Sequence, residues 1–256
     1  MWKTIRITLL LLVLAAVALH TWLDRVATQS WREPLWVGLF PLNADGSAST
    51  QEYVAALSVR DFAAVEDFFA REARRFGLPL EQPIHVELYP PGSRLPPSLD
   101  PSAGPLGIGW WSLKLRYFAS RATSVPGRAP PRIRLFLLYH DPTTLERAPD
   151  SHGMQKGLVG VVHLFADRDM AAGNSIVIAH ELLHTVGASD KYDLGNGSPL
   201  FPSGYGNRDQ DPLYPQERAE IMAGRRALSG YQSDMPRTLA GELIGPETAR
   251  EIRWTH

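Results

Sequence analysis

The chain has 256 residues, of which 44% are hydrophobic, and after an N-terminal segment this length supports one domain of about 220 residues with a full core. Its 26 Lys and Arg residues against 27 Asp and Glu residues give a net charge of -1, which offers no electrostatic basis for binding nucleic acid, and no nucleic-acid-binding motif is present. The absence of cysteine excludes disulfide bonds, cysteine-ligated zinc and a cysteine nucleophile.

The N-terminus has the pattern of a membrane-targeting segment. Lys3 and Arg6 precede an apolar run, Ile7 to Leu19, which reaches Leu23 when the polar residues after it lie at the membrane interface. We interpret residues 1–23 as an uncleaved signal anchor that forms a transmembrane helix, with a cleaved signal peptide as the alternative. In both cases the basic residues stay in the cytoplasm and the rest of the chain lies outside it, bound to the membrane or secreted.

A short linker, residues 24–34, leads to the predicted domain over residues 35–256, which begins with a strand at 35–40. Residues 58–76 open with a capping box and carry apolar side chains at helical spacing, so they predict a helix. Residues 84–88 alternate between apolar and polar side chains, which is typical of a half-buried strand.

Two more strands are predicted in the middle of the chain. Residues 133–139 are apolar on both alternating sets of positions, as in a central strand covered on two faces, and residues 158–165 form the next strand. Residues 89–107 and 123–131 are rich in Pro, Gly and Ser and predict loops. Between these loops, residues 110–118 combine aromatic and basic side chains in a short helix. We interpret it as packed on the core, and contact with a membrane surface is the alternative.

One segment, from His180 to Asp190, indicates a specific chemistry. Residues four apart on a helix project from nearly the same side, so His180 and His184 can offer two imidazole nitrogens to one metal ion, with Glu181 beside them as a base. A catalytic zinc site needs a third protein ligand. Gly187 can take a left-handed conformation that ends the helix and returns the chain, which makes Asp190 the predicted third ligand.

The third ligand and the first residue of the helix each have an alternative. Asp193 replaces Asp190 as third ligand if the turn after Gly187 runs longer. The helix is expected to begin at Asn174 or Ser175, because both residues are good N-caps. Behind the histidines we expect a buried apolar stripe that consists of Ile176, Ala179, Leu183 and Val186.

The pattern H-E-x-x-H-x-x-G-x-x-D over residues 180–190 resembles the metzincin clan of zinc peptidases, in the form that has Asp as third ligand. The resemblance implies an α+β fold in which a twisted mixed sheet of about four to five strands packs on helices, with an active-site helix and a methionine turn beneath the metal. Met222, within the segment Ala219–Gly224, is the candidate for that methionine. Some metzincins place a helper tyrosine two residues after it. This chain has Gly224 there, so the resemblance assigns no oxyanion-stabilising side chain.

The resemblance also concerns substrate binding. In metzincin-like folds the strand just ahead of the zinc helix is an edge strand, and an extended substrate pairs with it. The resemblance therefore implies this role for residues 158–165.

Together these patterns predict a zinc-dependent endopeptidase that acts outside the cytoplasm. One zinc ion is held by His180, His184 and Asp190, and Glu181 takes the proton of a zinc-bound water that attacks a peptide carbonyl. The expected partners are a peptide or protein substrate and, through the N-terminal segment, the membrane. Two alternatives stay open: a zinc-containing module that binds peptides without cleaving them, and a zinc hydrolase of a non-peptide amide such as a cell-wall component.

Overall fold

The structure is a computed structural model that describes residues 2, 4–8, 11–12, 28–100, 102–122, 130–154 and 158–255. The helices in these ranges are all too short or too polar to cross a membrane. Most of the predicted membrane segment, residues 1–23, and most of the predicted loop at 123–131 lie outside the described residues.

A mixed five-stranded sheet forms the centre of an α+β fold, which confirms the predicted class and the sheet of four to five strands. Its strands run in the spatial order β2-β1-β3-β5-β4, and β4 is antiparallel to β5 while the other pairs are parallel. The five strands are β1 (Leu35–Asn43), β2 (Ile84–Leu88), β3 (Ile133–His140), β4 (His152–Met154) and β5 (Val159–Phe165).

The prediction that residues 158–165 form an edge strand is wrong. The strand there, β5, pairs with β3 on one side and with β4 on the other, where Gly160 lies opposite Gly153. The edge beside the predicted zinc helix is therefore β4. The strand β4 has only three residues, with a glycine in the middle, and so it shows no alternation of apolar and polar side chains from which a strand could be predicted.

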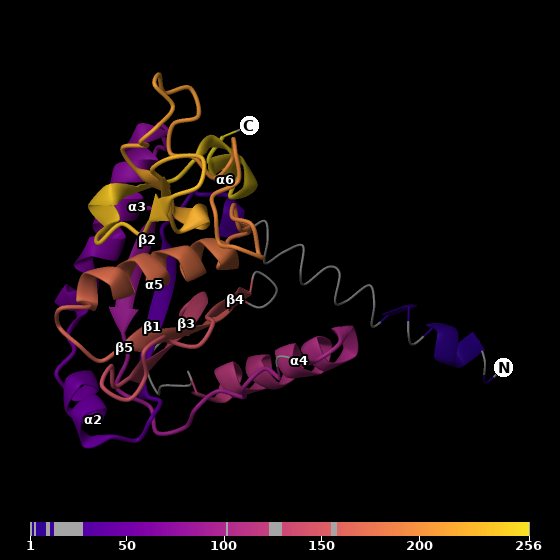
Figure 1. Cartoon of the computed structure of the whole chain (residues 1–256). Helices are drawn as coiled ribbons and strands as arrows, with labels where there is room; N and C mark the ends of the chain where they lie inside the picture. Colours follow the sequence, from indigo (N-terminus) through magenta and orange to yellow (C-terminus); the bar gives the residue numbers. More distant parts are fainter. Residues whose placement is uncertain are drawn as a thin grey trace.

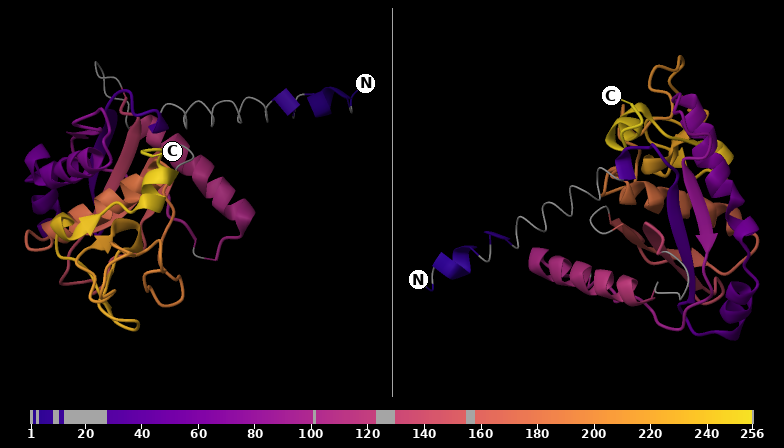
Figure 2. Two further views of the ribbon diagram at one scale, coloured as in Figure 1. Left: turned by 90° about the horizontal axis from the view of Figure 1, so that it is seen from above. Right: turned by 180° about the vertical axis from the view of Figure 1, so that it is seen from behind.

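Helices cover the sheet on both faces, as Figures 1 and 2 show. Side chains of α3 and α5 pack on one face and those of α4 pack on the other, each within its own apolar cluster. The helices are α2 (Ala48–Ala55), α3 (Ala63–Arg75), α4 (Pro105–Ala122), α5 (Ala171–Thr185) and α6 (Pro246–Glu251). The helix α4 is longer than the predicted helix at 110–118, and it begins inside the predicted loop at 89–107.

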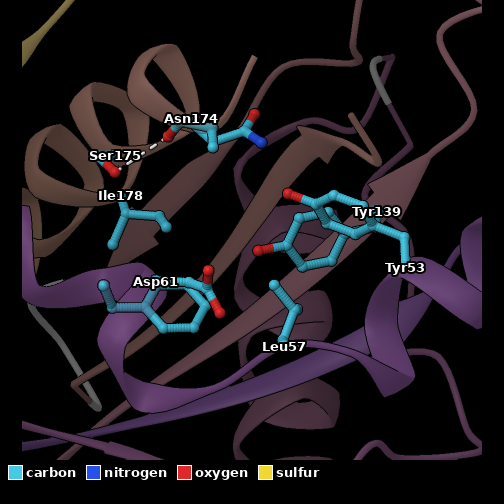
Figure 3. Close-up of a pocket in the computed structure, with 9 residues that line it drawn as sticks. Tyr53, Leu57, Asp61, Tyr139, Asn174, Ser175 and Ile178 are labelled. Atoms are coloured by element: carbon cyan, nitrogen blue, oxygen red, sulfur yellow. Dashed lines mark hydrogen bonds between the residues drawn. The ribbon is translucent and has the colours of Figure 1, made fainter. Parts of the chain in front are cut away.

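The helix α5 begins at Ala171, earlier than the sequence predicted. Asn174 and Ser175 are not N-caps but buried residues inside its first turns (Figure 3). The Asn174 amide accepts from the backbone N–H of Phe165 at 3.2 Å and donates to the carbonyl of the same residue at 2.8 Å. Asn174 therefore ties the helix to the end of β5, a tertiary role that a local capping rule cannot predict.

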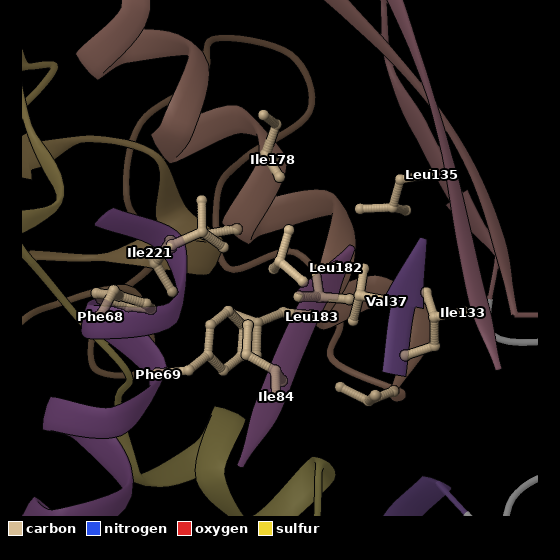
Figure 4. Close-up of a cluster of buried hydrophobic side chains, with 14 of the residues drawn as sticks. Val37, Phe68, Phe69, Ile84, Ile133, Leu135, Ile178, Leu182, Leu183 and Ile221 are labelled. Atoms are coloured by element: carbon tan, nitrogen blue, oxygen red, sulfur yellow. The ribbon is translucent and has the colours of Figure 1, made fainter. Parts of the chain in front are cut away.

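The main core lies between the sheet and the pair α3 and α5 (Figure 4). In the central strand β3, Leu135 and Leu137 face this core, whereas Phe136 and Leu138 face the second cluster under α4. This two-sided burial confirms the prediction for residues 133–139. The predicted apolar stripe of α5 is confirmed as well, because its members are all at most 8% exposed: Ile176, Ala179, Leu183 and Val186.

The packed domain extends back to residue 28, inside the stretch 24–34 that we interpreted as linker. Trp31 is buried, and its indole N–H donates to the carbonyl of Ile252 at 2.7 Å. The buried Gln29 amide donates to the carbonyl of Val186 at 2.6 Å, directly after the end of α5. These residues support the turn between the end of α5 and Asp190.

The segment after α5 consists of short elements, two of which, η2 and η3, pack against that helix. It comprises β6 (Ala219–Glu220), the 3-10 turn η2 (Ile221–Ala223), β7 (Arg226–Ala227), β8 (Ser233–Asp234), η3 (Leu239–Gly241) and β9 (Glu242–Leu243). β6 pairs in parallel with β9, which brings Glu220 next to Leu243.

Glu242 on β9 is a buried acid with an unusual environment. It is fully buried, and among the described residues its two carboxylate oxygens have no hydrogen-bond partner. Burial and the charge of Glu220 raise the pKa of Glu242 from 4.5 to about 8, against the opposing charge of His180. The folded protein therefore holds a proton that the unfolded chain releases between these pH values, and stability falls as the pH rises through that window.

We expect Glu242→Gln to remove this pH dependence. Between pH 5 and pH 9 the parent should lose roughly 4 kcal/mol more stability than the variant, because the parent must carry a buried, unpaired charge at the higher pH. Urea unfolding at pH 5 and pH 9 measures the difference. Glu217→Gln, at an exposed position, is the control. Equal slopes of stability against pH in both variants would contradict the expectation.

Candidate metal centre

His180 and His184 lie one turn apart on α5 and direct their rings toward one point. Their Nε2 atoms are 3.1 Å apart, and both side chains are mostly buried. The apolar stripe of α5 packs on the core behind them, so the helix cannot rotate to expose the rings without exposing that stripe.

A backbone carbonyl orients each ring through its Nδ1 atom. His180 Nδ1 lies 3.0 Å from the carbonyl oxygen of Ile221, and His184 Nδ1 lies 2.9 Å from that of Ala188. A carbonyl only accepts, so each Nδ1 is the protonated nitrogen and each Nε2 of a neutral ring has a free electron pair. Such outer contacts are the usual way of orienting histidine ligands.

The turn after α5 brings Asp190 back to the histidines. Gly187 has a φ of 108°, the left-handed conformation expected where the helix ends. Asp190 Oδ1 then lies 3.3 Å from His180 Nε2 and 3.2 Å from His184 Nε2. Asp193, the alternative third ligand, is exposed, and its carboxylate accepts from the backbone N–H groups of the turn that follows it.

These three ligand atoms fit the geometry of a tetrahedral metal ion. Ligand atoms about 2.0 to 2.1 Å from a tetrahedral zinc lie about 3.3 Å from each other, and the three separations here are 3.1, 3.2 and 3.3 Å. Asp190 Oδ1 is buried, and it lies within ion-pair distance of both histidine Nε2 atoms. Three electron-rich atoms at such distances repel each other unless a proton or a metal cation lies between them, so this donor set could hold a metal ion in place of the proton.

The charges around His180 and Asp190 also favour the binding of a cation. Burial lowers the pKa of His180, but the Asp190 and Glu181 carboxylates outweigh it and raise that pKa to about 9. Burial raises the pKa of Asp190, yet the two histidines hold it far below its usual range. A proton on His180 and a metal ion compete for the same electron pair, so metal uptake releases a proton and weakens as the pH falls.

The buried carboxylate of Glu181 lies beside the triangle of ligand atoms that His180, His184 and Asp190 form. It is 5% exposed, and its Oε2 atom has no hydrogen-bond partner among the described residues. Ligand atoms of Glu181, His180 and His184 lie within 4.8 Å of each other. Burial raises the pKa of Glu181, while the two histidine charges and the backbone N–H of Gly153 oppose that shift. A carboxylate with a raised pKa is suited to take up and return a proton.

The sequence did not predict the contact between β4 and α5. Gly153 lies so close to the helix that a Cβ atom at this position would be 2.7 Å from His184 Cβ and 3.0 Å from Glu181 Oε2. The Glu181 backbone carbonyl would lie closer still, and real Cβ atoms essentially never lie under 3.0 Å from another atom, so only glycine fits without a shift. The edge strand therefore runs directly along the site.

Met222 lies in the turn η2, directly after Ile221, whose carbonyl faces His180 Nδ1. It is fully buried, its carbonyl accepts from the backbone N–H of Lys191 at 2.9 Å, and Gly224 ends the turn with a φ of 65°. Glu220 anchors this turn, since its carboxylate accepts from the backbone N–H groups of Ala223 and Gly245, both at 3.1 Å. The turn thus links Lys191, the residue after Asp190, to the Ile221 carbonyl that orients His180.

Tyr192 is a further polar side chain at the site that the sequence analysis did not assign. Its side chain is partly buried. Burial raises the pKa of its phenol, as do the charges of Asp190 and Glu181 and a hydrogen bond with Asp190. Its position two residues after Asp190 was the only available signal in the sequence.

A different hollow near the start of α5 is too small to be the substrate site. Tyr53, Tyr139 and Asp61 line it together with Asn174 and Ser175 (Figure 3), and its volume is about 10 Å³. This is room for about one water molecule.

The chain matches no protein-family model, and it has no significant similarity to a curated protein. The interpretation of the site therefore depends on its own residues and geometry.

We expect Asp190→Ala to weaken zinc binding by at least about 100-fold, because the site loses one of three ligands and its only anionic one. Competition with a chromophoric chelator measures the dissociation constant. Asp193→Ala is the matched control, three residues away and exposed. Equal zinc affinities for the two variants would exclude Asp190 as a ligand.

Proposed function

We propose that the protein is a zinc-dependent endopeptidase with a metzincin-like site, acting outside the cytoplasm. The observation that carries the proposal is the triangle of His180, His184 and Asp190 with the buried carboxylate of Glu181 beside it. A purely structural zinc has four protein ligands and no use for an adjacent base, whereas a catalytic zinc leaves one position open.

In this proposal His180, His184 and Asp190 hold the zinc ion, which supplies an activated water and polarises the substrate carbonyl when it is bound. Glu181 accepts the proton of the attacking water at its carboxylate. It then delivers that proton to the departing amine, so one side chain acts first as base and then as acid. Its raised pKa favours this double role.

Tyr192 is the proposed hydrogen-bond donor toward the developing oxyanion. Its phenol interacts with Asp190 and is partly buried, which keeps it protonated at neutral pH. Such a donor replaces the side chain that is missing at Gly224.

The edge strand β4 is the proposed docking strand for an extended peptide. Among the described residues β4 pairs only with β5, so its other edge is open for strand addition. Gly153 places this strand against Glu181, so a peptide paired with β4 would pass the catalytic carboxylate. Met222 would serve as the metzincin-like methionine turn, and the N-terminal segment would hold the domain at the membrane.

The test uses the full chain in detergent. After dialysis against a chelator, zinc is titrated back and a mixed peptide library is analysed by mass spectrometry for internal cleavage. We expect one zinc ion per chain, and cleavage that disappears on chelation and returns with zinc. Failure to bind zinc would refute the metal site. Tight zinc binding without cleavage would favour peptide capture or a non-peptide amide as substrate.

A further inference from the structure

The helix α4 carries apolar side chains on two opposite faces. The face that packs on the second core cluster consists of Trp111, Leu115 and Ala119. The opposite face consists of Leu106, Trp110, Leu113 and Tyr117, which are 92, 62, 57 and 66% exposed. Spacings of four, three and four residues place these four side chains in one stripe. No described element of the chain buries this stripe.

Basic residues border the exposed stripe. Lys114 and Arg116 lie on its two sides, and the guanidinium of Arg121 lies 6.0 Å from the ring centroid of Tyr117. The helix sequence contains no acidic residue. An apolar stripe with a tryptophan and a tyrosine, flanked by cations, is the pattern of a helix that lies in the interface of a bilayer containing anionic lipid.

A hollow beside the C-terminal end of α4 also combines basic and aromatic side chains. Its volume is about 510 Å³, and Arg94 and Arg121 line it together with the aromatic rings of Phe118 and Phe136. Cations next to apolar walls suit a phosphate headgroup whose acyl chain continues into the bilayer.

The predicted signal anchor would bring this face near a membrane. α4 leaves the body of the domain on the side from which residues 4–8 extend (Figures 1 and 2). The predicted signal anchor ends at residue 23 and the packed domain begins at Thr28, so covalent geometry allows at most about 18 Å between these two residues.

We propose that the exposed stripe of α4 docks on the surface of a bilayer that contains anionic lipid. The helix lies in the interface rather than crossing it, since no described helix has the length and hydropathy of a span. The ring of Trp111 on the buried face lies 6.1 Å from that of His152 on β4, so docking would hold the edge strand close to the membrane. The proposal does not depend on the metal chemistry.

The absence of cysteine allows a direct test in the full chain. Leu113→Cys is labelled with an environment-sensitive fluorophore, and the protein is reconstituted in vesicles of phosphatidylcholine and phosphatidylglycerol. Tyr231→Cys, at a 99% exposed position in the turn between β7 and β8, is the matched control. We expect the label at 113 to shift to shorter wavelength and to be quenched by brominated lipid, while the label at 231 stays in water.

The charge dependence gives a second readout. Without phosphatidylglycerol the quenching at 113 should decrease, and Lys114→Ala should reduce docking by about five-fold. Lack of quenching at 113, or equal quenching at both positions, would overturn the proposal. A spectral shift at 113 that depends on protein concentration in the absence of lipid would also overturn it, in favour of a second copy of the chain as partner.

Discussion

Replacement of Glu181 by Gln is expected to lower the rate of peptide cleavage by roughly 10³- to 10⁴-fold while one zinc ion per chain stays bound. Glutamine has nearly the same shape but cannot accept a proton at the reaction pH. The change should leave the fold intact, because the glutamine carbonyl oxygen can still accept from the backbone N–H of Gly153, and Glu181 Oε2 has no hydrogen-bond partner to lose among the described residues. Single-turnover assays with a fluorogenic peptide, together with zinc analysis, measure both effects.

The control for this variant is Glu217→Gln, which changes the same chemical group at an exposed position. It should keep the parent rate. If Glu181→Gln retained more than about a tenth of the parent rate with zinc bound, Glu181 could not be the proton acceptor, and another base would have to be sought.

The second large effect is expected at Gly153, where any side chain would collide with α5. Gly153→Ala places a methyl group 2.7 Å from His184 Cβ and 3.0 Å from Glu181 Oε2, so β4 and the helix must separate. A displacement of the catalytic groups on the order of 1 Å lowers catalytic rates by about 100-fold. We also expect a loss of roughly 1 to 3 kcal/mol in the free energy of unfolding from overpacking.

Gly173→Ala is the matched control, because this glycine lies on α5 itself and a Cβ there meets no described atom within 4 Å. Its activity should equal that of the parent, and its stability should rise by up to about 1 kcal/mol through helix propensity. If Gly153→Ala were as active as Gly173→Ala, β4 would not position the catalytic groups or the substrate.

The parts of the fold that periodicity could predict are those with long, regular apolar patterns. The strands at 35–40, 84–88 and 133–139 are confirmed, since their apolar residues are buried on one face of the sheet or on both. The helix predicted for residues 58–76 is found as the 3-10 turn η1 (Val59–Phe62) followed by α3, which buries one helical stripe. The start of α5 was predicted too late, because the polar Asn174 is used to bind the end of β5 and not to cap the helix. The strand β4 was missed because three residues have no period.

The residues of the candidate site also fall into those that the sequence predicted and those that it did not. His180, Glu181, His184 and Asp190 were proposed from spacing alone, because a helix followed by a glycine turn has nearly fixed geometry over eleven residues. Gly153 and Tyr192 could not be assigned in advance. Gly153 reaches the site through strand pairing, and the sequence placed Tyr192 beside Asp190 but could not show where its side chain lies.

The sequence by itself therefore determined the end of the helix, the glycine turn and the donor atoms of the candidate metal site, because these depend on contacts between near neighbours in the chain. Only the tertiary structure decided which strand borders that site, how the turn η2 orients His180 from 41 residues away, and that one apolar face of α4 stays uncovered. These features depend on pairing and packing between distant segments, whose geometry no local pattern encodes.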